Sequence, residues 1–237
     1  MKQVKITTLS GVIGALMVAS MPAQAEFSGN ITLTSDYIFR GFTQTDQKPA
    51  VQGGFDYSHE GTGFYAGIWA SNVDFVDDVS IEIDYYLGVT GETASVGWDV
   101  GVLYYDYPSD DEQDFDYVEY KVAMSYEFLT AEYYYSPDFF GKPSDEAHYF
   151  SIGADFDLPL DMAIAVHWGH QMIEDANGNN DDESYNDWSI GISREVYGVG
   201  LDVTYYDTSA VNDNFSGANN CDSVCDSRVV FSISKSL

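Results

Sequence analysis

Hydrophobic and polar residues alternate along most of the chain after residue 25, which is the pattern of β-strands with one apolar face. We predict twelve strands: residues 30–40, 51–59, 64–71, 80–90, 96–105, 116–128, 130–136, 148–158, 162–171, 186–196, 199–207 and 228–237. This part of the sequence has no stretch with a helical period. We therefore predict an all-β protein with a single domain over residues 26–237.

The connections between these strands alternate in length. The short ones are residues 59–63, residues 91–95 and tight turns near Leu129, Pro159 and Tyr197; the long ones are residues 41–50, 72–79, 106–115, 137–147, 172–185 and 208–227. Short turns at one end and long loops at the other, with an even strand number, are typical of bacterial outer-membrane barrels. A soluble β-sandwich gives no reason for this alternation. The predicted fold is a closed, antiparallel, up-and-down transmembrane β-barrel of 12 strands, with short periplasmic turns and long acidic extracellular loops.

The acidic residues of the predicted strands all fall on one face when positions are assigned to alternate sides. They are Asp36, Asp56, Glu82, Asp84, Asp99, Glu119, Glu127, Glu132, Asp155, Asp157, Glu195 and Asp202. The opposite face is apolar and includes Tyr37, Phe39, residues 81–89 at odd positions and the end of the last strand. We expect the acidic face to line the lumen and the apolar face to contact lipid. Residues 64–71 are apolar on both sides, so their orientation is not predicted.

The N-terminal segment resembles a secretory signal peptide. Lys2 and Lys5 form a positive region, residues 12–19 are a short apolar run, and residues 23–25 read Ala-Gln-Ala. The apolar run is shorter than the ~20 residues of a spanning helix. We expect Sec-dependent export, cleavage between Ala25 and Glu26, and localisation in the outer membrane.

Composition and charge narrow the expected partners. Aromatic residues make up 16% of the chain, as two interfacial girdles require. Without Lys2 and Lys5 the chain has 7 basic residues against 39 acidic ones, a net charge of −32. This balance argues against nucleic acid, whose binding depends on phosphate neutralisation by basic residues. The expected partners are outer-membrane lipid and lipopolysaccharide, the barrel-assembly machinery and a small polar solute; no cofactor is expected.

One stretch carries a family resemblance. The pieces are Leu33-Thr34-Ser35-Asp36-Tyr37, Phe39-Arg40-Gly41, Gln44-Thr45, Pro49-Ala50, Gln52-Gly53 and Asp56-Tyr57. This opening, over residues 28–75, resembles the TorF-type family of proteobacterial outer-membrane porins, and weaker similarity continues through most of the chain. The resemblance implies passive entry of small solutes through a barrel.

Six charged residues are candidates for lining a lumen constriction. They are Asp36, Arg40, Glu82, Asp84, Glu119 and Lys121, all at inward positions of the predicted strands. Acidic rings favour cations, so we expect a narrow channel that prefers cationic or zwitterionic solutes. Two alternatives stay open: these residues form internal salt bridges that hold the barrel together, or the barrel is plugged and acts structurally or in adhesion through its loops.

Two features of the long loops have simple explanations. Cys221 and Cys225 lie four residues apart in an exported protein, which favours a disulfide within the last long loop. Residues 175–183 resemble a calcium loop but lack Gly at the sixth position and Glu at the twelfth. We interpret this run as a solvated acidic loop, with weak bridging of lipopolysaccharide by divalent cations as the alternative, and we identify no metal site.

The last candidate is catalytic. Ser151 and His167 point inward on two strands joined by the turn near Pro159, and a turn centred there would place them opposite one another. A nucleophile beside a base is what acyl transfer requires, and some outer-membrane barrels are phospholipases. Those enzymes use lipid-facing residues, however, so we predict that the protein is not an enzyme and keep the hydrolase as the weakest alternative.

Overall fold

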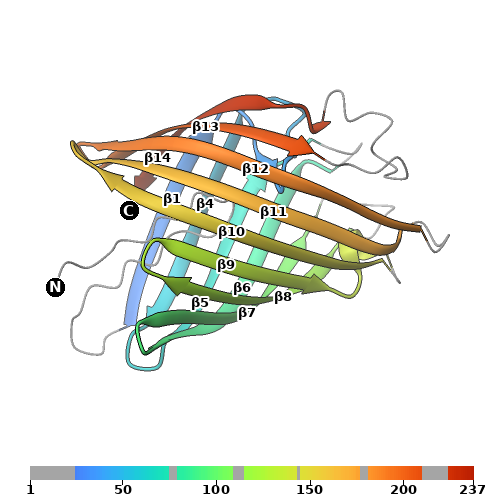
Figure 1. Cartoon of the computed structure of the whole chain (residues 1–237), viewed down its shortest axis with the longest axis horizontal. Helices are drawn as coiled ribbons and strands as arrows, with labels where there is room; N and C mark the ends of the chain where they lie inside the picture. The colour runs from blue at the N-terminus through green and yellow to red at the C-terminus, as the bar shows by residue number, and fades with distance from the viewer. Residues whose placement is uncertain (1–24, 75–78, 109–114, 143–144, 177–180, 210–223) are drawn as a thin grey trace.

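The computed structural model describes residues 25–74, 79–108, 115–142, 145–176, 181–209 and 224–237. Within these residues twelve strands form one closed barrel (Figure 1). The barrel strands are β1 (Ala25–Thr34), β4 (Ala50–His59), β5 (Phe64–Asn72), β6 (Ile81–Thr93), β7 (Val96–Asp106), β8 (Tyr117–Tyr126), β9 (Leu129–Ser136), β10 (Glu146–Leu158), β11 (Met162–Ala176), β12 (Asp181–Val196), β13 (Val199–Ser209) and β14 (Arg228–Ser236). Two short strands, β2 (Ile38–Phe39) and β3 (Phe42–Thr43), form a separate hairpin, and η1 (Phe139–Gly141) is a single 3₁₀ turn.

Every barrel strand pairs antiparallel with two neighbours, and β1 closes the ring by pairing with β14, with Leu33 opposite Ile233. Closure leaves no sheet edge with unpaired backbone groups. The prediction of a closed, antiparallel barrel of twelve strands is confirmed. No helix in the described part of the chain is long and apolar enough to cross a membrane.

The short turns and the two ends of the described chain lie at one end of the barrel (Figure 1). Ala25 is opposite His59 at the first short turn, and the Leu237 N–H donates to Gly29 O. Several turns are two residues long with positive φ, as at Tyr197 and Gly198, where φ is 52° and 73°. Such turns match the right-handed twist of the strands they join.

One predicted long loop is wrong. Residues 172–185 were expected to connect two strands, but β11 continues to Ala176 and β12 starts at Asp181. The connection is therefore only residues 177–180, which lie outside the described residues. The extra strand positions carry acidic residues such as Glu174, Asp182 and Glu183, so no apolar stripe reveals a strand there in the sequence. Hydrophobic alternation does not detect the parts of strands that extend beyond the apolar band.

The first predicted strand is also too long. Residues 30–40 were expected to be one strand, but β1 ends at Thr34 and the chain then turns into the β2–β3 hairpin. Tyr37 and Phe39, predicted to face lipid, are packed in the interior instead. The alternation simply continues past the point where the strand ends, because the hairpin has alternating faces of its own.

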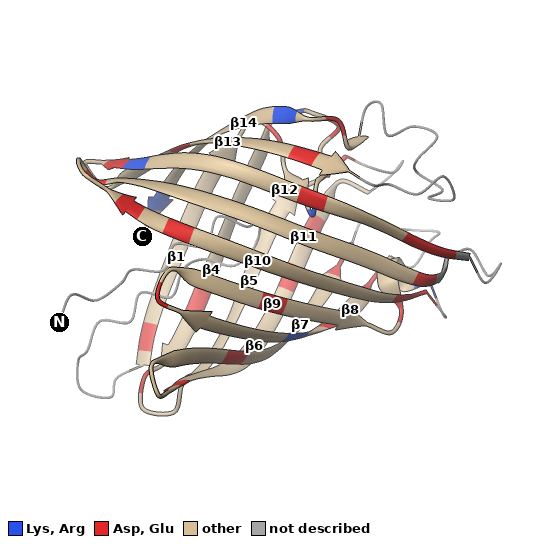
Figure 2. Cartoon of the chain, viewed as in Figure 1, with Lys and Arg blue, Asp and Glu red and all other residues tan. Residues whose placement is uncertain are grey.

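The remaining faces agree with the prediction. Ile31, Leu87, Val122, Ile152 and Ile233 are between 44% and 52% exposed on the outer surface. Acidic residues outnumber basic ones on the described strands (Figure 2), and the inward carboxylates of β6 and β8 are almost fully buried. The unoriented third strand places Tyr65 and Trp69 inside, and Phe64 and Ile68 outside.

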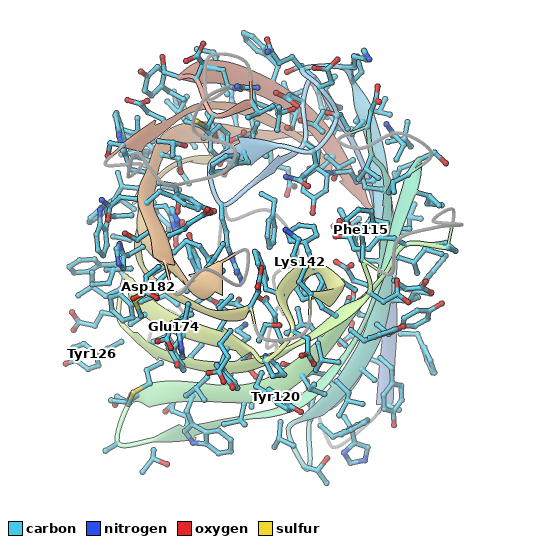
Figure 3. The ribbon with its side chains drawn as sticks, turned by 90° about the vertical axis from the view of Figure 1, so that its right-hand side faces the viewer. Phe115, Tyr120, Tyr126, Lys142, Glu174 and Asp182 are labelled. Carbon is cyan, nitrogen blue, oxygen red and sulfur yellow. The ribbon has the colours of Figure 1, made fainter. Side chains whose placement is uncertain are left out.

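Aromatic rings fill much of the interior. The buried cluster includes Trp69, Leu103 and a set of tyrosines from β5 to β8, with Phe139 of η1 above them. In the view along the barrel, η1 and Lys142 lie within the ring of strands, whereas Tyr126 points away from it (Figure 3). Glycines on neighbouring strands make room for the inward rings: a Cβ at Gly67 would lie 2.3 Å from the Tyr86 ring.

Candidate functional site

The β2–β3 hairpin folds back into the barrel rather than out from it. Its two strands pair Ile38 with Thr43 and Phe39 with Phe42. Arg40 and Gly41 form the tip, with φ of 46° and 88°. Two consecutive residues with positive φ make a type I′ turn, for which glycine is well suited and arginine is not. The tip is therefore held by contacts of the Arg40 side chain rather than by its backbone preference. We call residues 38–43 the lumen hairpin.

Asp36 fixes the base of the lumen hairpin. One of its carboxylate oxygens accepts hydrogen bonds from Thr43 Oγ1 (2.6 Å) and Thr45 Oγ1 (2.9 Å). The other oxygen accepts from Arg228 Nη1 of β14 at 2.9 Å. On the opposite side, the Asp74 N–H donates to Gln44 O. The hairpin is thus anchored to both flanking parts of the wall before it reaches the lumen.

Arg40 fixes the tip. Its guanidinium donates to both carboxylate oxygens of Glu119 on β8, at 2.8 and 2.7 Å, and to Gln171 Oε1 on β11 at 3.0 Å. The Tyr149 ring lies 4.2 Å from the guanidinium carbon. The side chains of Arg40 and Glu119 are 6% and 1% exposed. A bidentate pair of this kind has a defined geometry, and its charge-assisted hydrogen bonds are roughly twice as strong as neutral ones.

The wall formed by β12 and β13 also contacts the tip. Thr208 Oγ1 of β13 donates to Gly41 O at 3.1 Å, and the Phe42 ring packs on Tyr185 of β12. A Cβ at Gly41 would lie 2.4 Å from Thr208 Oγ1 and 2.9 Å from the Asp187 Cβ. The lumen hairpin therefore reaches across the lumen to Glu119 on β8 and also contacts β13, two strands from β1, where only glycine fits at position 41.

Glu82 lies beneath the hairpin without a cationic partner. It accepts hydrogen bonds from the hydroxyls of Tyr37 and Tyr107, each at 2.7 Å. Both tyrosines lie in loops outside the barrel strands. Burial, followed by the negative charge of Glu82, raises the pKa of each phenol well above its ordinary value. Both hydroxyls therefore stay protonated and remain donors to Glu82 at neutral pH.

Lys121 forms a second ion-pair layer, on the short-turn side of Glu119 along β8. Its ammonium lies 3.0 Å from Asp99 Oδ2 on β7 and 3.3 Å from Glu132 Oε1 on β9. The three groups link neighbouring strands across the inner wall. This arrangement agrees with the salt-bridge alternative for Lys121, because each of its carboxylate partners belongs to an adjacent strand.

All six predicted constriction residues are less than 10% exposed within the barrel. The predicted placement of Asp36 and Arg40 on one strand is wrong, since both lie in the loop that carries the lumen hairpin. The hairpin brings Arg40 to Glu119, which is 79 residues away in sequence. Asp84 is the exception among the six, because neither of its carboxylate oxygens has a hydrogen-bond partner. Their role in permeation stays a prediction.

The opposition predicted for Ser151 and His167 is wrong. The turn between β10 and β11 is centred on Leu160, so Ser151 is opposite Gly169 and His167 is opposite Gly153. Ser151 Oγ donates to Glu132 Oε2 at 3.5 Å, and His167 Nε2 lies 3.0 Å from Asp187 Oδ1. The one-residue shift of the turn centre moves the two side chains apart by a full inward step, and the hydrolase alternative loses its geometric basis.

One group among the described residues could hold a metal ion. Ligand atoms of Glu146, His148 and Glu174 all lie within 4.8 Å of one another, on the outer face near the long loops. The predicted disulfide involves Cys221, which lies outside the described residues. Residues 177–180 of the predicted acidic loop and the predicted signal peptide up to residue 24 also lie outside them.

Sequence reasoning missed the polar partners of the hairpin. Gln171 and Thr208 hydrogen-bond to the tip, and Tyr149 stacks on the Arg40 guanidinium. No motif marks these residues. The tyrosine pairs do carry a signal: two adjacent tyrosines in a strand must place one ring on each face, as Tyr104 and Tyr105 do.

The chain matches, over residues 19–237, the family described as a bacterial protein of unknown function (Gcw_chp). It belongs to that family. The description of this family does not include the TorF-type name, so the resemblance to TorF-type porins is not confirmed. No curated protein gives a significant match.

Two solved structures share the fold. One is an outer membrane channel from Pseudomonas putida F1, with a TM-score of 0.55 and 10% identity over 92% of this chain and 96% of that one. The other is the NanC porin, with a TM-score of 0.52 and 10% identity over 88% of this chain and 98% of that one. At such low identity the similarity shows the barrel fold alone.

Proposed function

We propose that this Gcw_chp protein is an outer-membrane channel for passive diffusion of small polar solutes, constricted by the lumen hairpin. The observation that carries the proposal is a closed barrel with apolar residues outside, paired charges inside, and a loop hairpin docked across the lumen. A barrel with an apolar outer band and a polar interior is the arrangement of outer-membrane channels. The TorF-type resemblance and the predicted export signal support the same location.

The interior charges support a preference for cationic or zwitterionic solutes. Inward carboxylates occur on β4, β6, β7, β8 and β9, whereas Arg40, Lys121 and Arg228 are the basic side chains paired with them or with the hairpin. An acidic lining raises the local concentration of cations and lowers that of anions. The docked Arg40 places one positive group among several negative ones, which suits a solute that carries both charges.

The plugged structural barrel is the second candidate. It is favoured by the burial of Glu119, Asp84 and Gln171, each at most 1% exposed at the level of the hairpin. Such burial leaves little room for a solute while the hairpin stays docked. The two functions differ in one respect: a channel conducts in its folded state, and a plug does not.

Reconstitution of the mature protein in planar bilayers separates them. We expect discrete single-channel steps for the wild type and uptake of small sugars or amino acids by liposomes. The absence of both conductance and uptake, with the protein shown to be folded and inserted, would favour the plugged barrel. Nothing in the proposed mechanism requires a chemical step, so no enzymatic activity is assigned.

A further inference from the structure

Asp84 has no partner for its charge in the structure described above. It is 0% exposed, and neither carboxylate oxygen has a hydrogen-bond partner. Its cross-strand neighbours are Trp69 on β5 and Tyr105 on β7. Tyr37 packs edge-on against Trp69, and Phe39 against Tyr105. The carboxylate therefore lies beneath the lumen hairpin, between one ring covered by Tyr37 and another covered by Phe39 of the hairpin.

The surrounding charges do not compensate for Asp84. Glu82 and Glu119 are the charged groups that act on it most strongly, and both are carboxylates. Glu119 already pairs with Arg40, and Glu82 has only the hydroxyls of two tyrosines. Three buried carboxylates thus face one guanidinium. Burying unpaired charge is strongly unfavourable unless a counter-charge is supplied.

A second unpartnered group faces the same charges. Tyr117 of β8 is 3% exposed, its hydroxyl has no hydrogen-bond partner, and it lies within electrostatic range of Glu119, Glu82 and Asp84. Its ring is stacked on Tyr105 at 4.4 Å, the ring that flanks Asp84. A carboxylate and a phenol oxygen that both lack partners are the groups a cation uses. A proton on Asp84 would also remove the charge, but its stabilising effect would not depend on which salt cation is present.

The number of free oxygens argues for a monovalent cation. Calcium takes six to eight oxygen ligands, and magnesium needs near-ideal octahedral geometry. Among the described residues, the three carboxylates Glu82, Asp84 and Glu119 are not close enough to share an ion, since the only group that meets that condition is the one at Glu146. We propose that the Asp84 carboxylate, with the Tyr117 hydroxyl, binds a small monovalent cation beneath the lumen hairpin. The proposal concerns binding, and it holds whether or not the barrel conducts.

Urea unfolding of the refolded protein in detergent tests this. A ligand that binds only the folded state stabilises it in proportion to the logarithm of its concentration. We expect the unfolding midpoint, followed by circular dichroism, to rise with sodium or potassium chloride above its value in N-methyl-D-glucamine chloride of equal ionic strength. Asp84→Asn should abolish that shift. Asp202→Asn, which alters another inward carboxylate with an unpaired oxygen on β13, should keep it.

One further variant and one further salt complete the experiment. Tyr117→Phe removes one oxygen only and should reduce the shift, which keeps the proposal testable if Asp84→Asn does not fold. Methylammonium chloride distinguishes the sources of the cation: a shift equal to that of sodium extends the site to ammonium groups of solutes, and its absence restricts the site to alkali ions. A wild-type midpoint that does not depend on the cation would overturn the proposal. So would a shift of full size in both Asp84→Asn and Tyr117→Phe.

Discussion

The buried basic side chains Arg40 and Lys121 each have their own carboxylate partners in this barrel. Arg40 has a bidentate carboxylate partner, and Lys121 bridges two carboxylates on its neighbouring strands. The sequence left two interpretations of these residues, a constriction or internal salt bridges. The geometry separates them: Lys121 ties strands of the wall together, whereas Arg40 ties a loop to the wall.

Replacing Arg40 with Ala is expected to release the lumen hairpin. Glu119 would keep its charge without a counter-ion, which disfavours the docked state by about 3–5 kcal/mol. The barrel strands do not depend on this contact, so folded yield and heat-modifiable migration should stay as in the wild type. Single-channel conductance should increase or its selectivity change.

Arg194→Ala on β12 is the matched control, since that arginine is exposed. It should leave the channel unchanged. If Arg40→Ala instead misfolds, and the fraction that inserts permeates like the wild type, then Arg40 is structural and the assignment is wrong.

Replacing Lys121 with Met is expected to lower the stability of the barrel rather than release the lumen hairpin. The change leaves Asp99 and Glu132 facing each other across β8 without a counter-charge. The free energy of unfolding should fall by about 3–5 kcal/mol, measured by urea titration. The triple variant with Asp99→Asn and Glu132→Gln should recover much of the loss, because it removes the unpaired charges as well. No recovery in the triple variant would show that unpaired charge on Asp99 and Glu132 does not account for the loss.

At the scale of elements, the lumen hairpin is a strand pair of the described chain that is not part of the barrel wall. Its turn has two residues with positive φ, one of them the non-glycine Arg40. Its base is bonded to Arg228 of β14 through Asp36, and its tip to Thr208 of β13. An element attached at both ends but not built into the sheet can change position without unfolding the barrel.

Replacing Gly41 with Ala should undock the hairpin tip. The φ of 88° is unfavourable for alanine, and the added Cβ would collide with Thr208 and Asp187. We expect larger single-channel conductance, with unchanged heat-modifiability on gels. Gly198→Ala is the control, because that turn has a similar φ of 73° but contacts only Lys235 at the short-turn end. An equal conductance change in both variants would assign the effect to backbone strain rather than to docking.

The whole molecule has the polarity of a protein that faces lipid outside and water or solute inside. Residues such as Phe55 and Phe231 are more than half exposed on the outer surface. At the same time its interior carries more negative charge than positive. Both properties belong to the complete ring of strands, since no single hairpin has an inside.

Heat-modifiable migration and a strand-dominated circular dichroism spectrum in detergent are therefore expected for the mature protein. Closed barrels with apolar outer bands resist unfolding by detergent until they are heated, because every strand is paired on both sides. Recovery of the protein as a soluble periplasmic species would contradict both the barrel in the membrane and the function proposed for it.

Cation preference is the expected permeation property. In asymmetric KCl the reversal potential should have the sign of a channel more permeable to potassium than to chloride, and the effect should weaken at high salt as the lumen charges are screened. An anion-selective reversal potential would refute the selectivity while leaving the channel itself in place.

The sequence by itself determined the number of barrel strands and the faces of most of them. Those features depend on a local rule: alternate residues of a strand point to opposite sides, and one side meets lipid. The rule gives the lipid-facing stripes of strands such as β6 and β8, and it places Glu82, Asp84 and Glu119 inside. It breaks down where strands extend beyond lipid, as at the meeting of β11 and β12, because polar residues there occupy both faces.

Only the tertiary structure decided where the first loop goes. Residues 35–40 continue the alternation of β1, so nothing local distinguishes a longer strand from a hairpin that turns inward. The distinction comes from Glu119 and Thr208, which are 79 and 167 residues from their partners in the hairpin. The orientation of β5 and the isolation of Asp84 were decided in the same way, because a buried charge finds or lacks its partner only when distant strands come together around it.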